Sequence, residues 1–361
     1  MALDFVSNEE IVEAARRNLS QGAWDYLAGG SESETTMRRN RLGFDRLAFR
    51  PRVLVDVSKI DTSTTFLGQR LRIPVTLAPI GSLQLFTPEG GAASARAAGE
   101  FGTLHIVSSV TEPSLEEIAA ASPAPKIFQL YIRGDWEWIK GMLDRAKQAG
   151  YLGLTITVDT AIYSRRERPL LSRWAPPTRR AAPAPNEPPY GAQVTWETLD
   201  RIKDYIGLPL LVKGIATAED AALAVQHGVD VVWVSNHGGR QLDHGLGTID
   251  MLPEIVKAVD GKAEIILDGG IQRASDVLKA VALGAKAVAV GKLQGWGLAA
   301  AGQEGLVKVL ELLEHEMTSA MGLLGITRID QLTSAYVRQA EPVVHPHEMS
   351  AWTNMPEGRI L

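Results

Sequence analysis

The sequence contains no cysteine, which excludes disulfide bonds, a thiolate nucleophile and cysteine metal ligands. It has no apolar run near the roughly 18–20 residues that a membrane-spanning helix needs, and residues 1–18 lack the apolar core of a signal peptide. Acidic residues outnumber basic ones, 42 against 37, so the net charge of −5 provides no basic field for nucleic acid or anionic lipid. These absences predict a cytoplasmic protein that binds neither membranes nor nucleic acid.

The chain does contain a repeating alternation of short apolar runs and helical patterns. With 361 residues, 45% of them hydrophobic, it can bury one barrel-sized core or two smaller ones. The apolar runs lie at 73–78, 104–108, 126–130, 153–158, 208–212, 231–234, 264–267 and 287–290. Segments with helical spacing lie between them, at 89–100, 114–121, 137–149, 218–226, 252–259 and 274–283, and a last helix is expected at about 302–324. Several of these segments end in glycine, as helix C-termini prefer.

Eight strand–helix alternations predict an α/β fold, a single (β/α)8 TIM barrel that spans residues 1–361. A doubly wound open sheet is the structural alternative. No G-x-G-x-x-G follows the first strand, which argues against a nicotinamide-binding Rossmann domain.

Three segments lie outside this repeat. An N-terminal helical segment is predicted from the pattern capped by Ser7 or Asn8 and from residues 21–28. The long connection after the fourth strand, residues 161–193, is rich in proline and arginine, a composition typical of a mobile lid or of a disordered surface excursion. The tail at 334–361 is compatible with an arm that contacts another subunit or with a frayed end.

The strand ends carry polar groups, and in a parallel barrel all carboxyl ends meet at one face, where active sites lie. The run that best shows this begins at Val231 and ends in a polar cluster that holds His237, two glycines and Arg240. An imidazole can exchange a proton near neutral pH, and a guanidinium matches a carboxylate. We therefore expect a binding site for a small acid at this face.

The cluster also carries a family resemblance. Residues 235–241, which read Ser-Asn-His-Gly-Gly-Arg-Gln, resemble the active-site signature of the FMN-dependent L-2-hydroxy acid oxidases and dehydrogenases. The resemblance extends from about Trp24 to about Leu324. It implies an FMN cofactor, oxidation of an L-2-hydroxy acid to the keto acid, O2 or another electron acceptor, and a homotetramer.

The cofactor site is predicted from the remaining strand ends. The ends of the last two strands are the usual phosphate site of such barrels, and Asp268, Gly270, Arg273, Gly291 and Lys292 suit it. Neutral hydrogen bonds to the flavin pyrimidine are expected from Ser108, Gln129 and Thr157. Lys213 would stabilise the charge of a reduced flavin, as the matching lysine of the family does. Pro79, Ile80, Gly81 and Ser235 complete the predicted set.

The substrate site is predicted at the same face of the barrel, where the strands end. Arg240 would bind the carboxylate, with Arg166 assisting from the long connection. The resemblance implies the same role for Tyr26, because Trp24-Asp25-Tyr26 aligns with a family segment whose tyrosine hydroxyl binds the carboxylate. Tyr131 would hydrogen-bond the hydroxyl oxygen. His237 would act as the base, oriented by Asp159. The proton that His237 takes is either that of the hydroxyl, with hydride passing to the flavin, or that of the α-carbon.

Some positions depart from the family pattern. Relatives usually have arginine at the positions of Gln272 and Lys292, so weaker FMN binding is expected here. Val110 stands where glycolate oxidases carry an aromatic residue, and with Gly81 it predicts a roomier pocket for a larger side chain, such as that of mandelate.

Two alternatives stay open at this point. One is an FMN enzyme with another substrate, such as an isomerase or a peptide-modifying oxidase, and the other is a non-catalytic FMN-binding relative. A metal site is not predicted, because the proline inside His345-Pro346-His347-Glu348 fits no helical ligand pair.

Overall fold

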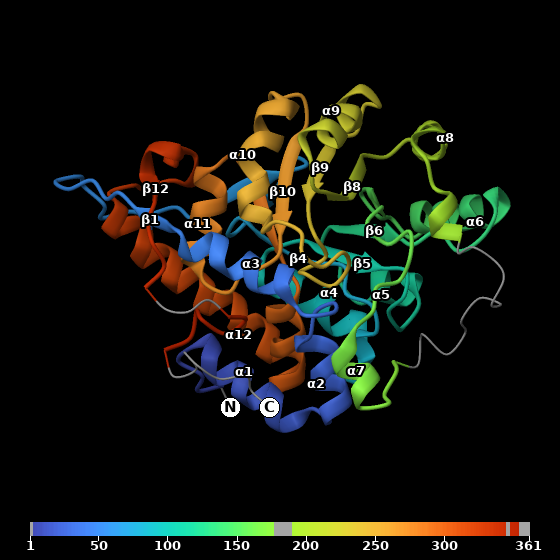
Figure 1. The fold of residues 1–361 in the computed structure, drawn as a ribbon, viewed down its shortest axis with the longest axis horizontal. Coiled ribbons are helices and arrows are strands. Elements are labelled where there is room, and N and C mark those ends of the chain that lie inside the picture. Colours follow the sequence, from blue (N-terminus) through green and yellow to red (C-terminus); the bar gives the residue numbers. More distant parts are fainter. Residues whose placement is uncertain (1–2, 177–189, 344–346, 354–361) are drawn as a thin grey trace.

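A computed structural model describes residues 3–176, 190–343 and 347–353. Eight parallel strands close into a barrel, which confirms the TIM-barrel prediction and excludes the open sheet (Figure 1). Around the barrel the order is β10-β11-β4-β5-β6-β7-β8-β9. The strands are β4 (Val75–Leu77), β5 (His105–Ser108), β6 (Lys126–Leu130), β7 (Leu154–Thr157), β8 (Leu210–Ile215), β9 (Val231–Val234), β10 (Glu264–Asp268) and β11 (Ala287–Val290).

The helices that surround the barrel bury apolar faces against it. They are α4 (Gly90–Phe101), α5 (Leu115–Ala120), α6 (Trp136–Gln148), α8 (Trp196–Ile206), α9 (Ala218–Gln226), α10 (Thr248–Val259), α11 (Ala274–Ala282) and α12 (Lys292–Leu324). Helix α12 is interrupted at Ala301 and Gly302, so the helix predicted from about residue 302 is its second half. Helix α8 was not among the predicted helices. No helix in the described part of the chain is long and apolar enough to cross a membrane.

The interior of the barrel is filled by apolar side chains from its strands, including Ile106, Ile127, Leu211, Trp233 and Ile266. The hairpin of β2 (Thr64–Phe66) and β3 (Gln69–Leu71) adds two buried side chains, from Phe66 and Leu71, to this cluster. A packed interior leaves the carboxyl ends of the strands as the face available for a site.

The N-terminal segment forms three helices, α1 (Asn8–Asn18), α2 (Gln21–Ala28) and α3 (Thr35–Asp45). The first two were predicted, whereas α3 was not. Helix α1 packs along α12 (Figure 1). Helix α3 lies close to α10, and through Asn40 and Arg41 it reaches the carboxyl end of the barrel.

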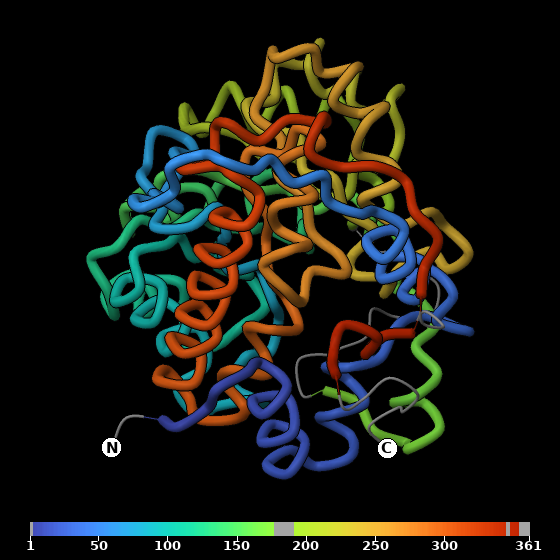
Figure 2. Tube along the Cα trace, turned by 90° about the vertical axis from the view of Figure 1, so that its left-hand side faces the viewer, coloured from blue at the N-terminus to red at the C-terminus, as the bar shows by residue number. Residues whose placement is uncertain are grey.

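The structure describes parts of the long connection and of the tail. Residues 161–176 include the short helix α7 (Glu167–Leu171), while residues 177–189 lie outside the described residues. In the tail, β12 (Val337–Gln339) pairs antiparallel with β1 (Leu47–Phe49), so this part is not a frayed end. Figure 2 shows that the last described residues return to the side of the molecule where α7 and the N-terminal helices lie.

Candidate active site

A cavity of about 830 Å³ opens at the carboxyl ends of the barrel strands. Its volume lies within the range of small-molecule sites and its lining mixes apolar and charged groups. The lining includes fourteen of the predicted site residues: Tyr26, Pro79, Ile80, Gly81, Tyr131, Thr157, Arg166, Lys213, His237, Arg240, Asp268, Gly270, Gly291 and Lys292. Strand ends distant in sequence therefore converge on one site.

His237 is held between a carboxylate and a phenol. Its Nδ1 lies 2.9 Å from Asp159 Oδ1, and its Nε2 lies 3.4 Å from the hydroxyl of Tyr131. The residue has a left-handed backbone conformation, with φ of 60°, and its backbone amide donates to Ser235 Oγ. Asp159 lies behind the ring, outside the cavity lining, and the side-chain amide of Gln241 donates to its carbonyl. This arrangement orients the imidazole with Nε2 toward the cavity.

The charges around His237 set its protonation state. Burial is the largest influence and lowers its pKa; Asp159 opposes this effect, and the nearby cations Lys213 and Arg166 add to it. Burial also disfavours ionisation of Asp159, but the charge of Lys213, the hydrogen bond with His237 and the attraction of its protonated form outweigh this effect, so that the pKa of Asp159 is lowered. At neutral pH the pair is therefore a neutral imidazole beside an ionised carboxylate, the state that a general base requires.

The buried amine of Lys213 belongs to a polar chain beneath the cavity. Its Nζ donates to Ser235 Oγ at 3.0 Å and lies 3.5 Å from Asp268 Oδ2, while Ser235 Oγ donates to Asp268 Oδ1 at 2.7 Å. The chain joins the ends of β8, β9 and β10, with Lys213 and Asp268 in the cavity lining. Ser235 stands behind them and links them to the amide of His237.

Arg240 lies at the side of the cavity formed by α2. Its Nη1 donates to the carbonyl of Gly29 at 2.6 Å, and its guanidinium lies 5.2 Å from the centre of the Tyr26 ring. Burial and the charge of Arg166 lower the pKa of Arg240 to about 10, which keeps it cationic at neutral pH. Arg166 lines the same cavity, and two guanidinium groups that face one polar cavity form a site suited to a carboxylate.

The cavity also fits a flavin. Gln129 Nε2 and Thr157 Oγ1 are buried and have no hydrogen-bond partner within the described part of the chain, and an unpaired buried polar group is unfavourable without a ligand. Gln129 lies behind the lining and accepts a hydrogen bond from Ser108 Oγ at 2.9 Å, which fixes the orientation of its amide. An amide NH2 group and a hydroxyl group are the kind of partners that the polar edge of a pyrimidine ring could satisfy.

The predicted phosphate end lies beside Gly269 and Gly270, whose backbones have φ of 95° and 87°. A side chain at Gly270 would come within 2.8 Å of the carbonyl of Asn40, so the close approach of α3 requires glycine. Lys292 lines this end, and burial lowers its pKa to about 7. Its Nζ lies 2.6 Å from the sulfur of Met37. The Lys292 amine is thus a cationic group in the cavity lining at this end.

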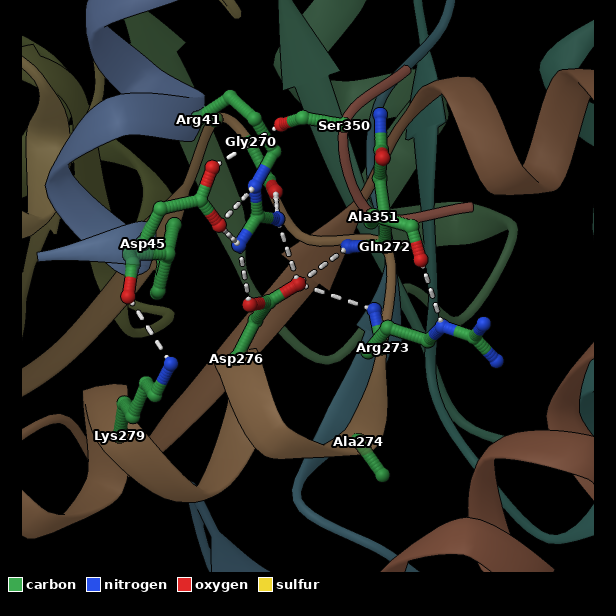
Figure 3. A network of polar contacts seen from close by, with 12 residues as sticks. Arg41, Asp45, Gly270, Gln272, Arg273, Ala274, Asp276, Lys279, Ser350 and Ala351 are labelled. Atoms are coloured by element: carbon green, nitrogen blue, oxygen red, sulfur yellow. Dashed lines mark hydrogen bonds and ion pairs between the residues drawn. The ribbon is translucent and has the colours of Figure 1, made fainter. Parts of the chain in front are cut away.

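Arg273 differs from the prediction, because its side chain is directed away from the cavity. Its Nη1 pairs with Glu316 at 2.6 Å and its Nε donates to the carbonyl of Ala351 at 3.1 Å. Figure 3 shows this orientation, together with the hydrogen bond from the Arg273 amide to Asp276. The adjacent Gln272 lines the cavity instead.

Helix α3 contributes a part of the site that sequence reasoning missed. Arg41 forms a buried ion pair with Asp276 at 2.8 Å and donates to the carbonyl of Gly270 (Figure 3). Asn40 and Asn236 exchange side-chain hydrogen bonds of 2.9 and 2.7 Å. Nothing in the local pattern of α3 indicates that it contacts the barrel, since these partners are about 200 residues away in the chain. Glu348 also lines the cavity unexpectedly.

Within the described residues, no group of three or more metal-ligating side chains is placed to hold a metal ion. Of the tail residues considered as ligands, His345 lies outside the described part of the chain, as does the intervening Pro346.

Comparison with known proteins agrees with this site. A family model described as FMN-dependent dehydrogenase matches residues 15–339. L-lactate oxidase of Nostoc sp. is 41% identical over 352 residues, which cover 91% of this chain and 96% of that protein. Glycolate oxidase of Spinacia oleracea is 36% identical over 354 residues, which cover 93% and 96% of the two chains. A solved structure of mandelate oxidase superimposes with a TM-score of 0.86 at 39% identity and covers 94% of this chain and 100% of that chain.

A closed barrel with a flavin-sized cavity at its carboxyl face, together with these relatives, defines a flavin-dependent oxidoreductase. The chain belongs to the FMN-dependent 2-hydroxy acid oxidase family, which makes it an FMN enzyme that oxidises 2-hydroxy acids.

Proposed function

We propose that the protein oxidises an L-2-hydroxy acid with a larger, preferably aromatic, side chain to the 2-keto acid, with His237 as the base. The observation that carries the proposal is the Asp159–His237–Tyr131 arrangement, which faces Arg240 across one cavity. The electrons pass to FMN and then to O2 or another acceptor. By resemblance to the family, the protein acts as a homotetramer.

The substrate is oriented by its carboxylate and its hydroxyl group. Arg240, Tyr26 and Arg166 bind the carboxylate, because they line the same part of the cavity and two of them carry a positive charge. Tyr131 hydrogen-bonds the hydroxyl oxygen. Burial and the neighbouring Asp159 raise the pKa of the Tyr131 phenol, so it stays protonated and serves as a donor. This binding brings the reacting carbon next to His237.

His237 is the residue that accepts a proton from the substrate. The oxidation removes two electrons and two protons from the carbon–oxygen unit, and His237 Nε2 accepts one of these protons. Asp159 then lies against an imidazolium and stabilises it, as its 2.9 Å contact with Nδ1 allows. The bound cofactor supplies the chemistry that no side chain can, by accepting the two electrons.

Residues on the other walls of the cavity would hold the cofactor. Ser108, Gln129 and Thr157 would bind the pyrimidine edge, and Lys213 would stabilise the negative charge of the reduced ring. Gly270, Gly291 and Lys292 would bind the phosphate, and Asp268 would receive the ribityl chain.

The preference for a larger substrate rests on the wall made by Gly81 and Val110. A side chain at Gly81 would come within 2.7 Å of Val110 Cγ2, so Val110 packs directly against Gly81 and is the side chain that bounds the cavity at this wall. Both residues line the cavity beside other apolar side chains, among them Phe86 and Ile132. Solved structures of mandelate oxidase with (S)-mandelic acid and (S)-4-hydroxymandelic acid are among the relatives, which supports an aromatic substrate.

The decisive experiment is the visible spectrum of the purified protein, followed by anaerobic addition of L- and D-hydroxy acids. We expect a flavin spectrum that is bleached by L-mandelate faster than by glycolate, and no bleaching by the D-enantiomer. A flavin that no hydroxy acid reduces would leave the protein as a non-catalytic FMN-binding relative. The highest specificity constant for glycolate would refute the preference for a large side chain.

A further inference from the structure

The last described residues of the chain, 347–353, fold back onto the phosphate end of the cavity. Gln272 Nε2 donates to the carbonyl of Glu348 at 2.6 Å, and Arg273 Nε donates to that of Ala351 at 3.1 Å. The Trp352 side chain is 2% exposed, with the guanidinium of Arg273 4.9 Å from its ring centre. Gln272 and Arg273, which follow the glycines at the end of β10, thus hold the segment in place.

A second contact connects residues 347–353 to α7, which belongs to the long connection after β7. Arg168 of α7 pairs with Glu348 at 2.7 Å and with Glu34 at 2.6 Å. All three side chains are largely shielded from solvent, with exposures of 17% for Arg168, 6% for Glu348 and 5% for Glu34. In this position Arg168 joins α7, the C-terminal segment and the turn before α3.

Glu348 and Gln272 also belong to the cavity wall itself. Both line it together with Gly270 and Lys292, at the end expected to receive the phosphate. Gln272 stands where the family usually has an arginine, and its amide is used for the C-terminal segment. Where the family usually has a cation, this chain therefore has an amide, and that amide binds the segment 347–353 that lies across the site.

We propose that residues 347–353 form a strap that retains the cofactor: they close the phosphate end of the FMN site, and Arg168 couples this closure to the connection above the substrate. The strap compensates for the missing arginine by slowing the release of FMN. The proposal rests on FMN binding alone, so it stands or falls separately from the choice of substrate.

The test measures FMN release and strap protection on the full-length protein. Release is followed by the recovery of free-flavin fluorescence after dilution of the holoprotein. We expect Glu348→Gln to release FMN on the order of tenfold faster, because it replaces a charged hydrogen bond to Arg168 with a neutral one. Glu341→Gln is the matched control, since it makes the same change at an exposed position of the same tail and should release FMN at the wild-type rate.

Amide hydrogen exchange of residues 347–353, with and without FMN, provides the second measurement. A retaining strap exchanges several-fold more slowly when FMN is bound, and Glu348→Gln removes that protection. Equal exchange with and without FMN would overturn the proposal. Slower release of FMN from Glu348→Gln would also overturn it, because it would mean that the Glu348 carboxylate repels the phosphate. If Glu348→Gln fails to fold, Trp352→Phe tests the same strap, since it trims a buried anchor and should also speed release.

Discussion

Asp159 Oδ1 lies 2.9 Å from Nδ1 of His237, so that the other ring nitrogen of the imidazole is directed toward the cavity. The carboxylate thereby fixes the ring, and its charge favours the protonated form of the imidazole. It does so from behind the cavity lining, out of reach of the substrate. Its contribution therefore acts through His237.

Replacing Asp159 by asparagine tests this relationship. We expect kcat to fall on the order of 10²-fold with little change in KM, since the amide keeps the shape but cannot stabilise an imidazolium. Steady-state kinetics on the best L-hydroxy acid measures both. His237→Asn is the reference variant and should lose on the order of 10²–10⁴-fold. Wild-type kcat in Asp159→Asn would contradict the assigned role.

The pH profile of kcat/KM should show the base directly. His237 must be neutral to accept a proton, and its pKa is lowered mainly by burial. Activity should therefore be lost as the pH falls through a pKa below the ordinary histidine value of about 6.5, and stay level above it. In Lys213→Met, one of the nearby cations is removed, so the pKa of His237 should rise and the acidic limb of the profile should move to higher pH. A limb that moves to lower pH in this variant would contradict the electrostatic account.

Lys292 predicts a pH dependence of FMN affinity. A phosphate binds the protonated amine, and burial lowers the pKa of Lys292 to about 7 in the absence of ligand. Affinity should therefore weaken as the pH rises above about 7, by up to about tenfold per pH unit while the bound amine stays protonated. Titration of the apoprotein with FMN, followed by fluorescence quenching, measures this. Lys292→Arg should abolish the dependence above pH 7 and bind more tightly at a pH of about 8.5, because a guanidinium stays charged there.

The wall made by Gly81 and Val110 predicts a change of substrate preference. Val110→Trp places a large ring against a position where even a methyl group at Gly81 would be crowded. We expect the specificity constant for mandelate to fall by at least about tenfold, while that for glycolate is retained or improved. Val110→Ile, a smaller change, is the control and should preserve the order of substrates. If Val110→Trp lowers the specificity constants for mandelate and glycolate equally, this wall does not determine the substrate preference.

The buried pair of Arg41 and Asp276 should be important for stability. Arg41→Met leaves a carboxylate buried beside two backbone amides, and breaking such a pair is expected to lower the free energy of unfolding by about 3–5 kcal/mol. Thermal or urea unfolding of the apoprotein measures this. Arg145→Met is the control, because it breaks an exposed ion pair with Glu116 and should change stability by about 1 kcal/mol or less.

Much of the barrel could be predicted from the sequence, because strands buried on both faces appear as continuous apolar runs. All eight predicted strands occur, and the run 126–130 coincides with β6. Glycines after the helices mark real ends, as at Gly102, which closes α4 with φ of 93°. Helix α3 was missed because its arginines and Asn40 interrupt any apolar stripe and its partners are remote in sequence; its burial depends on contacts with α10 and the β10–α11 turn.

The sequence by itself determined the number of barrel strands and the polar character of their carboxyl ends. These follow from local periodicity and from side-chain chemistry, which need no knowledge of neighbours. Only the tertiary structure decided which way Arg273 points, that α3 supports the glycine turn, and that Glu348 reaches the cofactor end. Those features depend on contacts between residues tens to hundreds of positions apart, and the direction of a long side chain is set by the partners that folding brings to it.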